Sequence, residues 1–143
     1  MSGDDHDPAP PVDLDRLLAA ARSVRRPLTL PRDCSAAKVG AALLTDDGTL
    51  FTGVNLDLAC GIGFCAEHSA VAEMLKTHRT RVVAVAAVGR RGVLPPCGRC
   101  RELLIQIDPA NANAEVLVAP GETVPLGELL PRHWYPSEAD AEA

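Results

Sequence analysis

Three cysteines and one glutamate, held in two short segments, could together carry out metal-assisted hydrolysis. One segment reads Cys-Ala-Glu over residues 65–67, and the other reads Pro-Cys-Gly-Arg-Cys over residues 96–100. Three thiolates, from Cys65, Cys97 and Cys100, would leave the fourth position of a tetrahedral zinc ion open for water, which separates catalytic from structural zinc sites. The Glu67 carboxylate could then move protons on and off that water. The two segments therefore predict a Zn²⁺ site with hydrolytic chemistry.

Two other interpretations of the cysteines account for fewer residues. A Cys-x-x-Cys pair also occurs in redox motifs and in structural zinc sites. A redox pair would leave Cys65 and Glu67 unexplained. A structural zinc site needs a fourth Cys or His, and the nearby His68 would point away from Cys65 if both lie on one helix. A closed structural site remains the alternative.

Helix starts must position these side chains. Cys97 and Cys100 are three residues apart at the start of a predicted helix, so both sulfurs lie on one face of its first turn. Cys65 opens another predicted helix. Helix N-termini stabilise thiolates. That stabilisation matters here because three thiolates on Zn²⁺ leave a net charge of −1.

Hydrophobic periodicity predicts the elements that carry these segments. Strands that alternate with crossover helices imply a parallel part of a sheet, and the hairpin at Asp46-Asp47-Gly48 adds an antiparallel part. The predicted fold class is therefore α/β, a three-layer α/β/α sandwich with a mixed sheet. The expected elements are a helix over 13–22, strands over 39–44 and 49–54, a helix over 65–78, a strand over 82–88, a helix from Pro96 in its first turn to 107, a strand over 115–119 and a helical turn over 128–130.

Length and composition limit the other possibilities. The chain of 143 residues suits one domain, which we expect over residues 12–136, between disordered tails over 1–11 and 137–143. The net charge of −5 argues against binding of nucleic acid. No apolar run approaches the roughly 20 residues of a membrane helix, so we expect no membrane partner. The acidic start lacks the apolar core of a signal peptide, and the five cysteines are an odd number. Both features favour a reducing, cytoplasmic location.

The order Cys-x-Glu, then Pro-Cys-x-x-Cys, is the signature of zinc nucleobase deaminases. Together with residues 39–43, 51–55 and 95–103, it makes the chain resemble the small zinc-dependent cytidine deaminases, including blasticidin S deaminase, over residues 14 to 135. The resemblance implies a cytidine deaminase-like fold and a homotetramer with shared active sites. It implies that Cys65, Cys97 and Cys100 bind zinc and that Glu67 shuttles protons.

The resemblance also implies how a substrate is held. Backbone groups of Ala66 and Pro96 would bind the pyrimidine edge, and Asn55 and Asp57 would bind the sugar hydroxyls. Trp134 lies where relatives place an aromatic residue that closes the pocket of a neighbouring subunit.

Four departures from the family pattern concern the pocket. Asp57 stands where the family has Glu, and the segment from Leu58 to Gly61 is one residue shorter than the family's usual segment. Ala37 falls where many relatives have an aromatic residue that stacks on the base. His68 replaces an arginine that offsets thiolate charge, for which Arg99 and Arg101 are candidate substitutes.

The predicted function is zinc-dependent deamination of a free cytosine nucleoside. Cytidine or deoxycytidine would yield uridine or deoxyuridine plus ammonia, as in pyrimidine salvage. One alternative is a deaminase of a modified cytosine nucleoside antibiotic such as blasticidin S, which local similarities around residues 51–55 and 91–101 favour. Another is a catalytically idle zinc-containing nucleoside-binding protein, which would have no need of Glu67.

Overall fold

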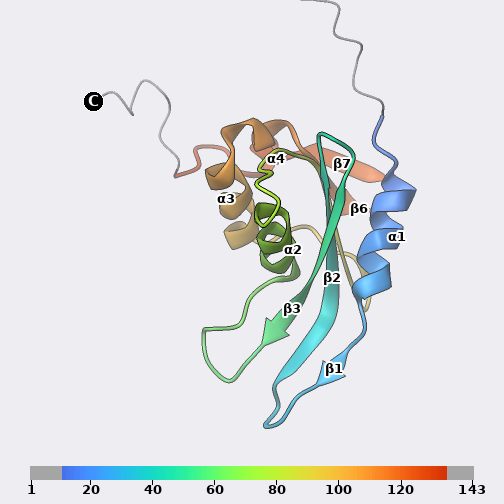
Figure 1. Ribbon diagram of the computed structural model, residues 1–143, viewed down its shortest axis with the longest axis vertical. Helices are drawn as coiled ribbons and strands as arrows, with labels where there is room; N and C mark the ends of the chain where they lie inside the picture. Colours follow the sequence, from blue (N-terminus) through green and yellow to red (C-terminus); the bar gives the residue numbers. More distant parts are fainter. Residues whose placement is uncertain (1–10, 135–143) are drawn as a thin grey trace, which may run out of the picture.

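The computed structural model describes residues 11–134 of the chain. These residues form one mixed sheet with helices on both faces (Figure 1). The predicted three-layer α/β/α sandwich is therefore confirmed. The two tails expected at 1–11 and 137–143 lie outside the described residues, apart from position 11, and so does the predicted domain boundary at 136.

The sheet of the described chain has seven strands. β3 pairs with one edge of β2, whereas β1 and β4 share the other edge. β4 and β6 are parallel, and the remaining pairs, including β4 with β5 and β6 with β7, are antiparallel. The strands are β1 (Leu28–Thr29), β2 (Ser35–Thr45), β3 (Leu50–Asp57), β4 (Val82–Gly89), β5 (Gly92–Val93), β6 (Glu115–Ala119) and β7 (Glu122–Pro125).

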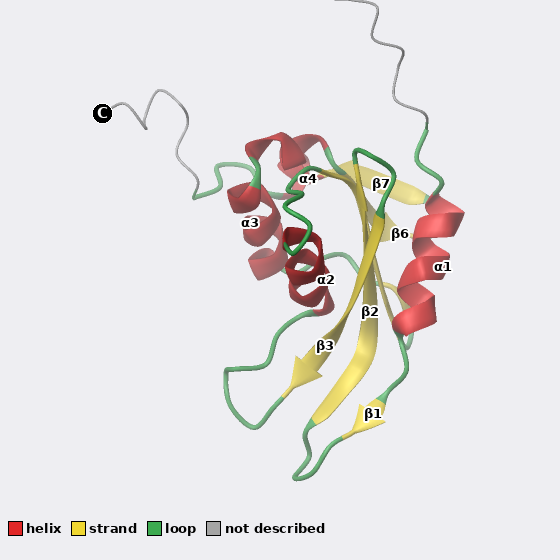
Figure 2. Ribbon diagram, in the orientation of Figure 1, coloured by secondary structure: helices red, strands yellow, loops and turns green. Residues whose placement is uncertain are grey.

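The helices divide between the two faces of this sheet. Helix α1 covers one face, and α2 and α3 cover the other (Figure 2). Within residues 11–134, no helix has both the length and the apolar character needed to cross a membrane. The helices are α1 (Leu14–Val24), α2 (Ala66–Leu75), α3 (Gly98–Ile107), the 3-10 helix η1 (Pro109–Asn113) and α4 (Leu126–Leu129).

Both faces of the central strands are buried, and each packs against helices. Because successive strand residues point to opposite faces, Ala42 and Ala84 pack with Leu17 of α1. Leu43 and Val85 pack in the cluster that contains residues of α2 and α3. Strand β4 is buried along almost its whole length, as its continuous apolar run predicts.

A glycine lets α2 lie close against β3. A Cβ atom at Gly53 would come within 2.3 Å of the Ala70 backbone nitrogen and 2.6 Å of the Ala66 carbonyl oxygen. Both distances are shorter than non-bonded contacts permit, so only a residue without a side chain fits between strand and helix. This contact fixes the height of α2 above the sheet and therefore the position of its first turn.

The observed elements differ from the predicted ones mainly at their ends. Helix α3 begins at Gly98 with Cys97 as its N-cap, so Pro96 precedes the helix instead of lying in its first turn. Helix α2 ends at Leu75, because His78 has a positive φ of 61°. The short turn near the C-terminus lies at Leu126–Leu129. Strands β1, β5 and β7 were not predicted, since two to four residues are too short to display a period.

The side chain of Asn111, in η1, is fully buried and forms hydrogen bonds to neighbouring parts of the chain. Its Oδ1 accepts a hydrogen bond from the backbone N–H of Val82 at 2.7 Å. Its Nδ2 donates to the carbonyl oxygens of Thr80 at 3.0 Å and Leu104 at 2.9 Å. One side chain thereby joins the start of β4 to the helix α3 that carries two of the cysteines.

Asn111→Ala should lower the free energy of unfolding by about 2–4 kcal/mol, because it removes the partner of two buried backbone groups, the Val82 N–H and the Leu104 carbonyl oxygen. Asn113→Ala is the matched control: Asn113 belongs to the same turn but is exposed, so its loss should change stability by less than about 0.5 kcal/mol. Urea unfolding followed by circular dichroism measures both. Equal losses for the two variants would show that Asn111 does not join these elements.

Candidate metal centre and active site

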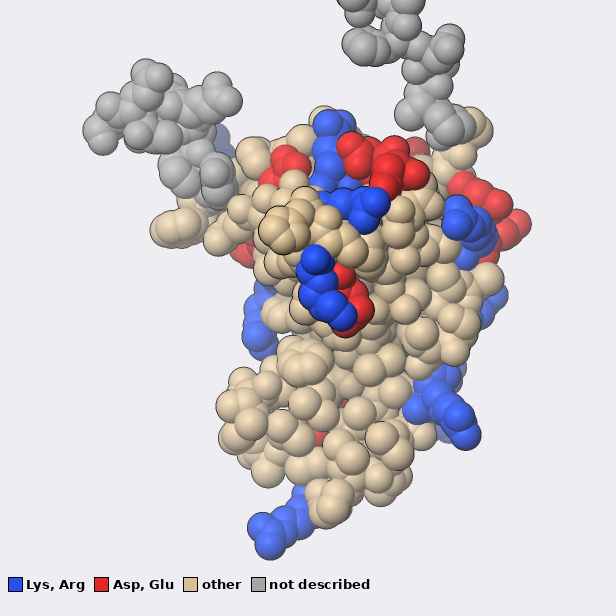
Figure 3. All heavy atoms as spheres, viewed as in Figure 1, with Lys and Arg blue, Asp and Glu red and all other residues tan. Residues whose placement is uncertain are grey.

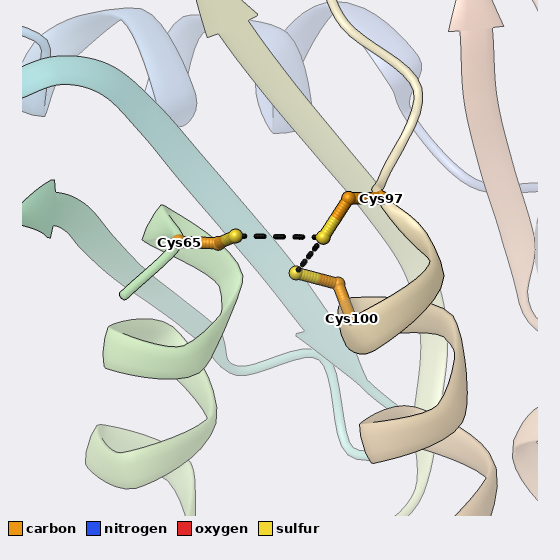
Figure 4. Close-up of side chains that lie close together, drawn as sticks. All are labelled: Cys65, Cys97 and Cys100. Carbon is orange, nitrogen blue, oxygen red and sulfur yellow. Dashed lines mark hydrogen bonds between the residues drawn. The ribbon is translucent and has the colours of Figure 1, made fainter. Parts of the chain in front are cut away.

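The N-terminal ends of α2 and α3 bring three cysteine sulfurs together. Cys65 points from the start of α2 toward Cys97 and Cys100 at the start of α3 (Figure 4). The Sγ atoms of Cys65 and Cys97 are 3.4 Å apart, and those of Cys97 and Cys100 are 3.5 Å apart. All three sulfurs lie within 4.8 Å of one another. The predicted cysteines therefore meet, although 32 residues separate the first from the second.

The local backbone explains why these thiols are free to meet. Cys65 and Cys97 are the N-caps of their helices, with extended backbone, and neither side chain caps its own helix. Cys100 lies in the first turn of α3 and is fully buried. N–H groups in the first turn of a helix have no partner within the helix, so both helix starts present positive partial charge to the sulfurs.

The environment of the thiols differs among the three. Burial raises the pKa of Cys65, and contact with Cys97 adds to this increase. Burial, followed by the charge of Glu67, raises the pKa of Cys100 far above its usual range. Burial also acts to raise the pKa of Cys97, but hydrogen bonds from the backbone N–H groups of Cys100 and Arg99 contribute to a net lowering. Buried thiols of this kind ionise when a cation neutralises them.

The donor set fits zinc. Sulfurs bound at about 2.3 Å to a tetrahedral zinc ion lie about 3.8 Å apart, close to the separations found here. Sulfur ligands suit a soft or borderline metal ion such as Zn²⁺. Mg²⁺ and Ca²⁺ instead prefer oxygen ligands. Cys65, Cys97 and Cys100 could therefore hold Zn²⁺ with little rearrangement.

Glu67 lies in the first turn of α2 beside this cluster. The residue is only 4% exposed, and its carboxylate lies next to the Cys100 thiol. It lines a pocket of about 390 Å³ that also reaches Cys65 and Cys97. A buried carboxylate at the junction of the sulfur cluster and an open pocket can exchange protons with a molecule bound there.

Asn55 and Asp57 lie at the end of β3 and line the same pocket. The Nδ2 of Asn55 donates to Oδ2 of Asp57 at 3.2 Å, and its Oδ1 accepts from the backbone N–H of Val39 at 2.9 Å. That N–H is available because the pairing of β2 with β3 shifts register between Ala36 and Gly40. The polar pair is thus held by the backbone of the neighbouring strand.

The remaining predicted substrate residues occupy different positions. Ala66 is buried and lines the pocket. Pro96 is buried but does not line it; the preceding Pro95 does. Trp134 is 77% exposed and lies away from the pocket, with its backbone N–H bonded to Glu102.

Two arginines were candidates to offset the thiolate charge. Arg99 lines the pocket. The pKa of His68 is lowered mainly by burial and secondly by the positive charge of Arg99, while the charge of Glu67 acts in the opposite direction. Arg101 instead donates from Nε to the carbonyl oxygen of Pro96 at 2.8 Å and from a terminal nitrogen to that of Leu129 at 3.0 Å. Arg101 therefore holds the backbone at the first residue of the second cysteine segment.

Sequence reasoning did not single out the apolar wall of the pocket. Leu56, Leu58, Phe64 and Leu94 all line it. Phe64 directly precedes the first cysteine, and this adjacency is the signal that could have identified it. Leu58 belongs to the shortened segment that the family pattern already linked to the pocket, whereas Leu56 and Leu94 carry no such signal in the sequence.

Comparison with known proteins agrees with this site. Residues 15–115 match the family model described as the cytidine and deoxycytidylate deaminase zinc-binding region. A cytidine deaminase of Mycobacterium tuberculosis is 41% identical over 96 residues, which cover 65% of this chain and 69% of that protein. A cytidine deaminase of Halalkalibacterium halodurans is 33% identical over 124 residues, covering 84% of this chain and 92% of the relative.

Solved structures show the same similarity. The crystal structure of the M. tuberculosis cytidine deaminase superposes with a TM-score of 0.74 at 33% identity and covers 88% of this chain and 100% of that one. That of the Burkholderia pseudomallei enzyme gives 0.67 at 32% identity, with 84% and 98% covered. Sequence, fold and cysteine cluster agree, and the chain belongs to the zinc-dependent cytidine deaminase family.

Proposed function

We propose that this chain is a zinc-dependent hydrolase that converts a free cytosine nucleoside, with cytidine and deoxycytidine as first candidates, to the uracil nucleoside and ammonia. The observation that carries the proposal is the position of Glu67. Its buried carboxylate lies beside three convergent cysteine sulfurs in the wall of a pocket. The names of the relatives point to the same substrate class.

Each group in the pocket has a part in this reaction. Zinc held by Cys65, Cys97 and Cys100 supplies Lewis-acid activation of water. Glu67 accepts a proton from the attacking water and donates it to N3 of the cytosine ring, while the water oxygen forms a bond to C4. It then takes the second proton from that oxygen as the C4 carbonyl forms and gives it to the amino group, whose bond to C4 breaks to release ammonia. Backbone groups near Ala66 and Pro96 orient the pyrimidine edge.

The polar pair Asn55 and Asp57 supports binding of a sugar. A carboxylate and an amide held 3.2 Å apart offer acceptors and a donor to neighbouring hydroxyl groups. A polynucleotide is a poorer fit. Basic and acidic side chains are interspersed on the face shown in Figure 3, and no continuous basic stripe crosses that face. Phosphate backbones bind to clustered Lys and Arg.

We also propose that four copies of the chain assemble, with Trp134 reaching the pocket of a neighbour. Ile62 and Trp134 are 71% and 77% exposed, and large apolar side chains this exposed often lie at contacts between subunits. Sedimentation should give the mass of four chains, and a monomer at micromolar concentration would contradict the assembly.

A cytoplasmic location and a role in pyrimidine salvage complete the proposal. The five cysteines are free thiols, which fits a reducing compartment. Cell fractionation against a cytoplasmic marker tests the location. Growth on cytidine as the sole pyrimidine source, lost when the encoding gene is deleted, tests the role.

Glu67→Gln should retain zinc and lose turnover, whereas Cys100→Ser should lose both. The amide keeps the shape of Glu67 but cannot carry the proton, which should slow the reaction by about 10²-fold to 10⁴-fold. Zinc per chain is measured by elemental analysis, and turnover by loss of ultraviolet absorbance on cytidine. Cys34→Ser, outside the sulfur cluster, is the control and should change neither. Full activity of Glu67→Gln would remove the assigned proton carrier.

The wild-type enzyme should deaminate cytidine and deoxycytidine but not blasticidin S in parallel assays. Asp57→Asn should raise KM for cytidine about tenfold and leave kcat nearly unchanged, because Asp57 binds the sugar and not the reacting atoms. Asp46→Asn, an exposed change in the β2–β3 turn, is the control. Turnover of blasticidin S alone would assign an antibiotic substrate. A zinc-loaded protein inactive on all three compounds would support a binding role.

A further inference from the structure

Cys97 is the most exposed of the three cysteines in the cluster, and its sulfur lies close to both of the others. The Sγ of Cys97 is 3.4 Å from that of Cys65 and 3.5 Å from that of Cys100. Cys97 stands where the incoming chain meets α3 (Figure 4). The course of that incoming chain therefore decides where this sulfur lies.

Two prolines, Pro95 and Pro96, lead into Cys97 and leave the backbone few ways to move. The ring of a proline fixes φ at about −65°, and a residue before a proline is restricted as well. At Pro96, ψ is then the main free dihedral angle. This angle sets the direction of the Pro96 carbonyl oxygen and the direction in which the chain enters Cys97. A hydrogen bond that holds this oxygen therefore also holds Cys97.

Arg101 binds the carbonyl oxygens on both sides of the Cys97 side chain. Its Nε donates to the carbonyl oxygen of Pro96 at 2.8 Å. Its backbone N–H donates to the carbonyl oxygen of Cys97 at 3.1 Å. The backbone bond belongs to α3 and does not depend on which side chain stands at position 101. The bond to Pro96, which sets the entry into Cys97, depends on the arginine.

The far end of the guanidinium group is anchored on α4. Nη1 of Arg101 donates to the carbonyl oxygen of Leu129 at 3.0 Å. Leu129 is the last residue of α4, where carbonyl oxygens have no partner within the helix. Leu126, at the start of α4, is fully buried in the core cluster that also contains residues of α3. Arg101 thus links a helix that is packed into the core to the chain just before Cys97.

We propose that Arg101 is a positioning residue of the metal centre, which holds Cys97 in place for zinc through Pro96 and uses α4 as its support. The inference deepens the proposed function, because it concerns the zinc site on which that function rests. This role differs from compensation of the thiolate charge, which any cation at this position could supply. A guanidinium presents rigidly spaced N–H groups to two acceptors, and a lysine ammonium on a flexible stem cannot reproduce that arrangement.

The test compares Arg101→Lys with Arg101→Met in the full-length protein. In competition with a chelator, both variants should bind zinc about tenfold to a hundredfold more weakly than wild type, as expected when a group that orients a metal ligand is lost. In the Co²⁺-loaded proteins, the visible absorption bands, which report coordination geometry, should shift or weaken in both variants. A charge role predicts instead that Arg101→Lys matches the wild type and that only Arg101→Met loses affinity, and that result would overturn the proposal.

Two controls on α1 separate positioning from a general loss of stability. Leu17→Ala removes a fully buried side chain on the opposite face of the sheet. It should lower stability and leave zinc affinity and the Co²⁺ spectrum unchanged. Arg22→Met, at an exposed position, should change none of these properties. If Leu17→Ala weakens zinc binding as much as Arg101→Lys does, the effect comes from stability and the proposal is wrong.

Neither readout requires a substrate, so the inference and the proposed function can fail separately. An active deaminase whose zinc affinity and Co²⁺ spectrum are the same in wild type and in both Arg101 variants would overturn the inference alone. A protein whose zinc affinity depends on Arg101 as expected, but which deaminates no nucleoside, would overturn the proposed function alone.

Discussion

The close packing of α2 against the sheet is the constraint on which the site depends. Gly53 gives the helix room to lie against β3. Ala41, Ala66 and Ala87 form a small cluster between the helix start and the central strands. Because these side chains are small, the first turn of α2 lies low enough for Glu67 to be buried and for Cys65 to reach the start of α3. Larger residues at these positions would lift the helix and separate the ligands.

Burial of the cysteine cluster affects the charge of the thiols as well as their positions. Burial raises the pKa of Cys65 and of Cys100, so these two thiols are costly to ionise without a nearby cation. The starts of α2 and α3 supply partial positive charge, and Arg99 lies in the pocket wall. A bound divalent metal ion would neutralise most of the negative charge of the three thiolates. The geometry that disfavours ionisation of Cys65 and Cys100 on their own also places all three sulfurs where they can bind one metal ion.

The sequence was sufficient to predict the long elements and the cysteine cluster. Helices α1 and α3, strand β4 and the β2–β3 hairpin follow from periodicity and turn residues, which are local properties. The cysteines were identifiable because ligand spacing is also local. By contrast, the pocket wall depends on where the segment from Leu58 to Phe64 crosses β3, which is decided by the backbone bridge between Leu56 and Phe64. The role of Asn111 depends on three carbonyl and amide groups that are distant in sequence, so no pattern could reveal it.

The irregular pairing of β2 has a consequence for how this pocket could change over evolution. The donor that holds Asn55 is a main-chain N–H at Val39, next to Ala37, whose φ is positive. A main-chain donor is present whatever side chain stands there. Side chains beside Val39 can therefore be exchanged while the amide of Asn55 keeps its orientation. The wall of this pocket can thus be remodelled around a polar side chain whose orientation does not depend on the side chains of β2.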